Sequence, residues 1–169
     1  MTLRPLTDAD VVAHDAGEDD ETIRWLSGGR GTAETTRTHF AMLAENLRAG
    51  RGKRGFGVWL DDRLAGYVDF DPDNRDGLDP GDVNIAYAVH PWARGRGLAA
   101  RAVDLLCKRL QQERLGTAAA LRIEPENTAS IRVAEKSGFV FVREFESATD
   151  VHADGRPVTM GLFRRPLSG

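Results

Sequence analysis

The sequence has very little cysteine and no long hydrophobic run. Its single cysteine, Cys107, excludes an internal disulfide and a cysteine-based metal cluster. The four histidines are scattered without the spacing of a zinc site, so we assign no metal ion. No apolar run approaches membrane-spanning length, and the N-terminus lacks a basic-then-apolar signal pattern. We therefore expect no membrane association and a cytoplasmic location.

An excess of charge of one sign is also missing. The formal net charge is −3 and the pI is about 5.8, which does not predict the general electrostatic surface of a nucleic-acid-binding protein. Any anion-binding site must therefore be local. The length of 169 residues fits a single domain, residues 1–169, that can bury a core without disulfides. Monomer and homodimer both remain open.

Hydrophobic periodicity divides the chain into strands and helices. We predict strands over residues 2–6, 56–60, 64–70, 83–89, 118–123, 139–145 and 158–163, and helical segments over 22–26, 32–49, 98–110 and 128–137. Ser27-Gly28-Gly29 should end the first helical segment, and Gly50 should end the second. This order predicts an α+β fold, with a mixed, mostly antiparallel sheet of about six to seven strands and helices packed on it.

A glycine-containing turn joins the strand expected at 83–89 to the most strongly helical segment. Pro91 cannot continue a strand ladder, and Gly95 and Gly97 permit a backbone path that side chains would block. The first amides of the following helix have no internal partner and carry the positive end of the helix dipole. The turn therefore predicts an anion site, most naturally for phosphate.

Two phosphate-binding motifs overlap in this turn. Gly95-Arg96-Gly97-Leu98-Ala99-Ala100 fits the dinucleotide fingerprint, with Glu124 as a candidate ribose-binding acid. A dinucleotide turn follows its strand directly, however, and here five residues intervene between Val89 and Gly95. The register Arg94-x-x-Gly97-x-Ala99 resembles the acyl-CoA pyrophosphate loop of the GNAT superfamily of N-acetyltransferases. A third interpretation is a helix start whose glycines only ease packing.

A second resemblance to the GNAT family follows about thirty residues later. The stretch from Asn127 to Phe139 resembles the Asn-x-x-Ser helix and Gly-Phe ending of the branch that includes ribosomal-protein alanine N-acetyltransferases. Leu3-Arg4-Pro5-Leu6-Thr7 resembles the opening strand of the family. Asn127 also suits a helix N-cap and Gly138 a left-handed C-cap, and we expect these structural roles to exist beside any functional ones.

The resemblance implies a cofactor site for acetyl-CoA. It implies helices on both faces of the sheet and a splayed pair of parallel strands, 83–89 and 118–123, with the pantetheine between them. The implied cofactor-binding residues are Val89, Arg94, Gly95, Arg96, Gly97, Leu98, Ala99 and Asn127. Arg94 and Arg96 would supply positive charge near the pyrophosphate. Ser130 occupies the position that can donate a proton to the departing thiolate, and Asn127 would bind near the thioester.

The residue that deprotonates the amine is not evident. Many relatives have Glu where this chain has Asn84, and an amide cannot serve as that base. Asp69 is our first replacement candidate and Glu124 our second, but each could instead be a solvated charge at a strand edge, and a water chain could act without a dedicated base.

The resemblance also bears on the amine acceptor. The early helices of the family wall the acceptor cleft, which brings Trp25, Phe40 and the acids between residues 15 and 21 into consideration; a solvated acidic face over two core aromatics is the alternative. We expect an acetyl-CoA-dependent N-acetyltransferase that acts on a protein N-terminus or a small-molecule amine by direct attack in a ternary complex. An acyl-CoA-binding sensor without transfer activity and a nicotinamide- or flavin-binding protein are the other hypotheses.

Overall fold

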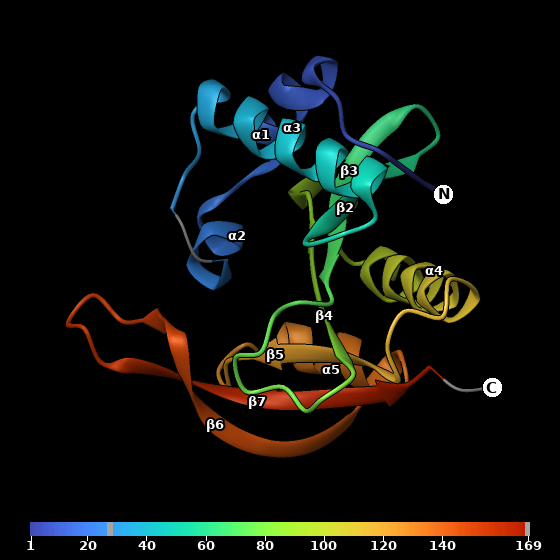
Figure 1. The fold of residues 1–169 in the computed structure, drawn as a ribbon. Coiled ribbons are helices and arrows are strands. Elements are labelled where there is room, and N and C mark those ends of the chain that lie inside the picture. Colours follow the sequence, from blue (N-terminus) through green and yellow to red (C-terminus); the bar gives the residue numbers. More distant parts are fainter. Residues whose placement is uncertain (27–28, 168–169) are drawn as a thin grey trace. The chain divides into compact units, whose positions relative to one another are not determined.

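The structure is a computed structural model that describes residues 1–26 and 29–167. Its elements are β1 (Thr2–Arg4), a 3-10 helix (Asp8–Asp10), α1 (Val11–Gly17), α2 (Asp20–Trp25), α3 (Ala33–Ala49), β2 (Arg54–Leu60), β3 (Arg63–Asp71), β4 (Asp82–Val89), a second 3-10 helix (Pro91–Ala93), α4 (Leu98–Gln112), β5 (Ala118–Ile123), α5 (Thr128–Lys136), β6 (Val140–Val151) and β7 (Pro157–Pro166) (Figure 1). Within the described residues seven strands form one sheet in the order β1-β2-β3-β4-β5-β7-β6.

The sheet is mostly antiparallel, with one parallel pair, β4 and β5. This confirms the predicted α+β class. By its internal contacts the chain divides into two compact units, one formed by residues 1–70 and 86–102 and the other by residues 71–85 and 103–169. Strand β4 and helix α4 each contribute residues to both units. A single domain over residues 1–169 stays a prediction.

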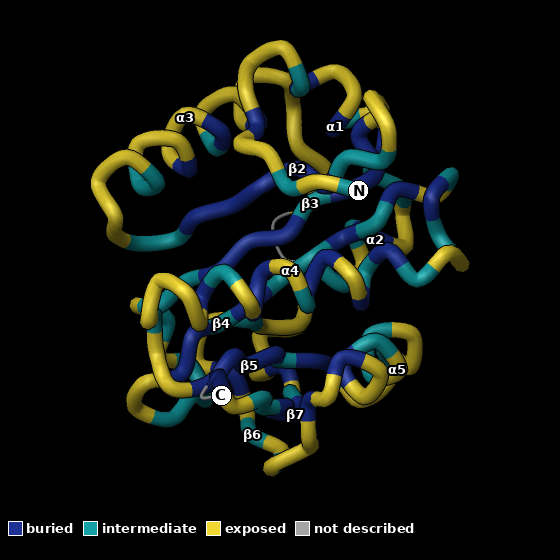
Figure 2. Tube along the Cα trace, turned by 90° about the vertical axis from the view of Figure 1, so that its right-hand side faces the viewer, coloured by how far each residue is buried: buried dark blue, intermediate teal, exposed yellow. Residues whose placement is uncertain are grey.

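The first unit is built on the antiparallel strands β1, β2 and β3. Leu3 pairs with Val58, and Phe56 pairs with Val68. Strands β2 and β3 are buried along most of their length, whereas much of the surface of α3 is exposed (Figure 2). One of its hydrophobic clusters consists of Leu6, Val11, Phe40 and Leu64, with Trp59 and Tyr67 packed against it. This cluster joins the helices to the sheet within the unit.

Helix α3 has the bounds that its capping residues predict. The Thr32 hydroxyl accepts a hydrogen bond from the Thr35 amide at 3.2 Å, and the Thr35 hydroxyl accepts one from the Thr32 amide at 2.8 Å. At the other end, Gly50 adopts a left-handed conformation with φ of 65°. The predicted stop at Ser27-Gly28-Gly29 falls largely on residues 27–28, which lie outside the described residues.

Three N-terminal segments differ from the prediction. Helix α1, Val11–Gly17, was not among the predicted helical segments; it buries Val11, His14 and Gly17. The helical segment expected at 22–26 begins earlier, at Asp20, because the Asp19 carboxylate accepts a hydrogen bond from the Thr22 amide at 2.9 Å and caps α2. Strand β1 ends at Arg4 rather than at residue 6.

The second unit contains β5, β6, β7, α5 and most of α4. Strand β5 has the predicted bounds and pairs with β7 in antiparallel fashion. Strands β6 and β7 are longer than predicted, because the polar segment after Phe145 continues the hairpin through a register shift between Glu146 and Val151. Cys107 lies in α4 with 2% of its surface exposed, and burial raises the pKa of its thiol to about 11.

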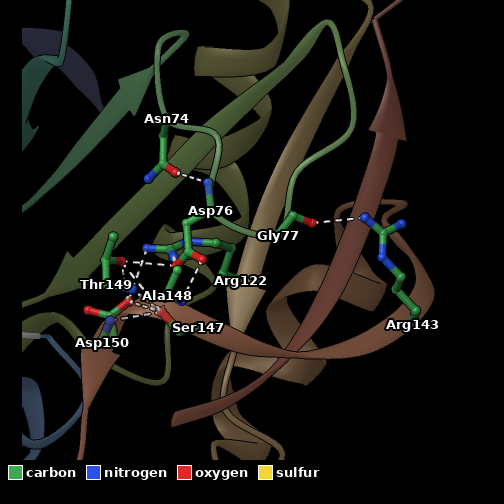
Figure 3. Close-up of polar contacts among 9 residues, drawn as sticks. All are labelled: Asn74, Asp76, Gly77, Arg122, Arg143, Ser147, Ala148, Thr149 and Asp150. Atoms are coloured by element: carbon green, nitrogen blue, oxygen red, sulfur yellow. Dashed lines mark hydrogen bonds and ion pairs between the residues drawn. The ribbon is translucent and has the colours of Figure 1, made fainter. Parts of the chain in front are cut away.

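A buried carboxylate fixes the loop before β4 within the second unit (Figure 3). Asp76 accepts hydrogen bonds from the Ser147 hydroxyl at 2.6 Å, the Ala148 amide at 2.8 Å and the Thr149 hydroxyl at 2.9 Å, and it forms an ion pair with Arg122. The side chains of Asp76 and Arg122 are 6% and 15% exposed. Burial opposes ionisation, but these donors outweigh it and lower the pKa of Asp76. The loop is therefore held on β5 and β6.

Candidate cofactor and catalytic site

The parallel ladder between β4 and β5 is short. It pairs Asp82 with Ala118, Val83 with Ala119 and Asn84 with Ala120. In the described part of the second unit it does not continue to Ile85 and Leu121, although both strands do. At the next position after Asn84, the backbone of β4 is thus not paired with β5. A splayed strand pair requires such an unpaired stretch.

Asn84 stands at the last rung of this ladder. Its side-chain oxygen is buried and has no hydrogen-bond partner among the residues that the structure describes. A buried acceptor without a donor is unfavourable unless a ligand or a water molecule satisfies it. The position therefore suits a ligand that brings an N–H group.

The turn after β4 has the backbone geometry that its glycines predict. Gly95 and Gly97 both adopt positive φ, 73° and 70°. The Arg101 amide donates to the Gly97 carbonyl at 3.2 Å, so the amides of residues 98–100 precede the first hydrogen bond of α4 and have no intrahelical partner. A Cβ atom placed on Gly95 would meet nothing within 4 Å, so the space beside the turn is open. These features fit a pyrophosphate group bound by backbone amides.

The two arginines of the turn have different surroundings. The Arg94 guanidinium donates to both oxygens of Asp19, at 2.6 and 2.7 Å, and to the Thr22 hydroxyl at 2.9 Å. Its Nε donates to the Val89 carbonyl at 3.1 Å. The paired guanidinium holds the pKa of Asp19 well below its usual range. Arg96 is exposed and has no ion pair or side-chain hydrogen bond within the described residues.

The second group of predicted site residues lies at the start of α5. The Asn127 side-chain oxygen accepts a hydrogen bond from the Ser130 amide at 3.1 Å, which confirms the N-cap. Gly138 has φ of 75°, as expected at a left-handed helix end. Asn127 and Ser130 are half-buried and lie three residues apart on this helix start. The cap uses the Asn127 carbonyl, and the amide NH₂ remains a potential donor.

The two base candidates have different environments. Asp69 is 4% exposed, and its carboxylate forms an ion pair with Lys53 at 3.2 Å. The interpretation of Asp69 as a solvated strand-edge charge is therefore wrong. The second candidate, Glu124, directly follows β5 and is half-buried, and its backbone carbonyl accepts a hydrogen bond from the Asn127 amide at 2.9 Å. The structure thus keeps Glu124 close to Asn127, whereas Asp69 lies in the other unit.

Titratable side chains also pack inside the first unit. The His14 ring lies 5.1 Å from the rings of Phe40 and Tyr67, and its Nε2 lies 3.5 Å from Glu18 Oε1. Burial, reinforced by His90, lowers the pKa of His14 to about 4, so the ring is neutral near pH 7. Burial likewise raises the pKa of Glu18. Phe40 is 3% exposed, which supports its interpretation as a core aromatic.

Sequence reasoning did not identify Asp19 and Thr22 as neighbours of the turn. An N-cap pattern, Asp19 three residues before Thr22, could have located the start of α2. No local signal indicates that Arg94, 75 residues away, pairs with that cap.

Other expectations concern a metal ion and membrane association. Among the described residues, no cluster of three or more His, Cys, Asp or Glu side chains is arranged to hold a metal ion. In the same part of the chain, no helix combines the length and apolar character needed to cross a bilayer.

The fold and the two motif-bearing helix starts define a chain of the acetyltransferase class. A sequence model of the acetyltransferase (GNAT) domain matches residues 1–140, and the chain belongs to this family. The match covers both motifs and confirms the resemblance that they carry.

Comparison with single proteins agrees with this assignment. The chain is 41% identical over 110 residues to the L-2,4-diaminobutyric acid acetyltransferase of Streptomyces coelicolor. The matched stretch covers 62% of this chain. It spans 61% of the length of that relative. The structure is similar to RimJ of Mycobacterium smegmatis in complex with a CoA disulfide, with a TM-score of 0.81, 21% identity and coverage of 97% of this chain and 80% of that one.

Two further solved structures share the fold. The first is RimL, a ribosomal L7/L12 alpha-N-protein acetyltransferase in complex with coenzyme A, with a TM-score of 0.80, 17% identity and coverage of 97% and 92% of the two chains. The second is the microcin C7 self-immunity acetyltransferase MccE in complex with acetyl-CoA and AMP, with a TM-score of 0.81, 12% identity and coverage of 98% and 91%. At these identities, the likeness to RimJ, RimL and MccE shows a shared fold.

Proposed function

We propose that the protein is an acetyl-CoA-dependent N-acetyltransferase that transfers an acetyl group to a primary amine. The observation that carries this proposal is the turn after β4, where two glycines with positive φ present the first amides of α4 in a chain of the GNAT family. Direct attack of the amine on the thioester in a ternary complex is the proposed route. Acetyl-CoA supplies an acyl group activated by a good leaving group, the CoA thiolate.

The proposed binding residues lie at the end of β4, in the turn that leads into α4, and at the start of α5. The amides from Gly95 to Ala99 would hold the pyrophosphate, and Arg96 is the exposed cation beside them. Val89 would contribute backbone at the end of β4; its carbonyl already accepts a bond from Arg94 and keeps one lone pair. The Asn127 amide NH₂ would donate near the thioester, because its oxygen is occupied by the helix cap.

Proton transfers require a donor for the thiolate and an acceptor for the ammonium. As the bond between the amine nitrogen and the acetyl carbon forms and the carbon–sulfur bond breaks, the Ser130 hydroxyl would give its proton to sulfur and regain one from water, while the amine loses a proton to the base or to water. Asn84 cannot take the proton of the amine, but its unpartnered side-chain oxygen can accept a hydrogen bond from the amine and orient the amine for attack. We retain Asp69 and then Glu124 as candidate bases. Asp69 is buried and forms an ion pair with Lys53.

The acceptor is proposed only as a primary amine, either a protein N-terminus or a small molecule. The curated relative is named for L-2,4-diaminobutyric acid, and RimL for a protein N-terminus, so both classes belong in a test. Calorimetry with acetyl-CoA comes first, followed by CoA release with diaminobutyrate, peptides with free N-termini, polyamines and aminoglycosides. A folded protein that does not bind acetyl-CoA would refute the proposal.

A sensor or interaction module that binds acyl-CoA without transfer is the second candidate. Asn84 favours it, because the usual carboxylate is replaced by an amide that cannot accept the proton. Binding of acetyl-CoA without CoA release by any amine of the panel would support this alternative, and release with one amine would exclude it. Cytoplasmic location, the absence of nucleic-acid binding and the choice between monomer and homodimer stay predictions.

A further inference from the structure

Arg94 occupies the motif position at which a cation near the cofactor phosphates is expected, yet its guanidinium is already engaged. An arginine side chain has five N–H donors in a fixed fork. Four of them donate to protein oxygens: one to Val89, two to the carboxylate of Asp19 and one to Thr22. The fifth N–H belongs to Nη1, and this nitrogen lies 3.5 Å from the Glu21 carboxylate. Four of the five donors are thus used within the protein, and the nitrogen that carries the fifth faces a carboxylate.

These partners come from two elements of the first unit. The Val89 carbonyl is the last of β4, so the bond from Nε keeps Arg94 folded back against the strand that it follows. Asp19 caps α2, and its Oδ1 accepts both from the Thr22 amide and from Arg94. The Arg94 and Asp19 side chains are each 34% exposed, while Thr22 is buried. One guanidinium therefore links the end of β4 to the first turn of α2.

We infer that Arg94 is a positioning residue, which holds the pyrophosphate turn in its binding conformation by pairing with the cap of α2, and that it is not itself a phosphate ligand. This inference rests on the proposed function, because it concerns the same cofactor site. Gly95 and Gly97 make the turn costly to order, since glycine loses more conformational freedom than other residues. An anchor at the residue before Gly95 reduces the disorder that acetyl-CoA would otherwise have to remove.

If Arg94 is a positioning residue, Asp19→Asn should change the affinity for acetyl-CoA in the direction opposite to the one that charge alone predicts. Removing a carboxylate near an anion site should strengthen the binding of a polyanion, and it should also free Arg94 to reach the phosphates. If Arg94 instead needs Asp19 to hold the turn, Asp19→Asn should weaken binding. Asparagine is a good N-cap, so this variant keeps the bond to the Thr22 amide and removes mainly the charged pairing with Arg94.

The matched control is Asp20→Asn. It removes the same charge from the adjacent residue, whose side chain is fully exposed and pairs with Arg30 rather than Arg94. With acetyl-CoA in a calorimeter, we expect Kd to rise at least about fivefold for Asp19→Asn, the lower end of couplings between protein sites. Kd should stay equal or fall slightly for Asp20→Asn. An unchanged or lower Kd in Asp19→Asn would overturn the inference.

A second pair of variants separates positioning from direct contact. Lysine keeps the charge of Arg94 but cannot make the forked bonds, and it binds phosphate well as a point charge. Arg94→Lys should therefore weaken acetyl-CoA binding about as much as Asp19→Asn, and the double variant should be little weaker than either single one. Full additivity would show that Arg94 acts independently of Asp19 and would overturn the inference.

Amide hydrogen exchange gives a readout that does not depend on turnover. The Ile23 and Leu26 amides donate to the carbonyls of Asp19 and Thr22, at 3.0 and 3.1 Å. Saturating acetyl-CoA should slow their exchange in the wild-type protein and have a smaller effect in Asp19→Asn, because binding and the order of α2 are coupled through Arg94. An equal effect in both would contradict the coupling. If the wild-type protein does not bind acetyl-CoA, the proposed function fails, and this inference fails with it for that separate reason.

Discussion

Replacing Asp76 by alanine should destabilise the protein far more than removing an ion-paired aspartate at the surface. The substitution leaves the Arg122 guanidinium, 15% exposed, with Asp150 as its remaining acidic partner at 3.3 Å, and it removes the acceptor for two hydroxyls and one amide. Breaking a buried ion pair by deleting one partner costs about 3–5 kcal/mol. A typical domain has only about 5–15 kcal/mol of stability, so the effect is a large part of the total.

Unfolding by urea and by heat, each followed by circular dichroism, tests this expectation. For a chain of this length, a loss of about 3–5 kcal/mol lowers Tm by about 6–20 °C. Asp76→Asn should lie between wild type and Asp76→Ala, because an amide oxygen still accepts hydrogen bonds but no longer balances Arg122. Asp154→Ala is the control, since Asp154 pairs with Arg156 at 2.8 Å and both side chains are more than half exposed. We expect no measurable change there.

Equal midpoints for Asp76→Ala and Asp154→Ala would refute the reasoning. Such a result would mean that the loop before β4 does not depend on the buried carboxylate, and that the bonds of the Asp76 carboxylate drawn in Figure 3 contribute no more than a solvated ion pair.

Three other predictions concern acid stability, turnover and cofactor binding. Folding lowers the pKa of His14 from 6.5 to about 4, so the unfolded chain binds a proton more readily and acid favours unfolding. We expect the free energy of unfolding to fall by up to about 3 kcal/mol between pH 6.5 and pH 4. Urea titrations at each pH should show a smaller loss in His14→Leu. Ser130→Ala should lower kcat more than it changes acetyl-CoA Kd, since its proposed contact strengthens as the thiolate forms, and an equal loss in both would indicate a binding role. Gly97→Val should raise the Kd for acetyl-CoA, because a β-branched residue is strained at φ of 70°, whereas Gly155→Val, at φ of 82°, should strain its own turn without this effect.

The sequence predicted those elements whose limits depend on local chemistry. Helix α3 lies between Thr32 and Gly50, and α5 between Asn127 and Gly138, because capping residues act within a few positions of the helix ends. Strand β5 is an apolar run interrupted by Arg122 and has the predicted bounds. The resemblance to the GNAT family then supplied the parallel pairing of strands 83–89 and 118–123, which periodicity alone could not give.

What the sequence did not predict depends on distant partners. The polar continuation of β6 is stabilised by Asp76, more than 70 residues earlier in the chain, so its own residues gave no strand signal. Helix α1 buries His14 among aromatic rings, a contact that helical spacing alone does not indicate. Likewise, the motif at Arg94 indicated a cofactor loop but not the pairing with Asp19.

The buried thiol of Cys107 simplifies how turnover can be observed. Because the chain has one cysteine, and that side chain is buried in α4 and protonated at neutral pH, the folded protein presents almost no reactive sulfur to an aromatic disulfide dye. Colour formed during a reaction would then report free CoA directly, without subtraction of a protein background. Colour that grows in the absence of an amine would instead signal either hydrolysis of the thioester or opening of the helix around its sulfur.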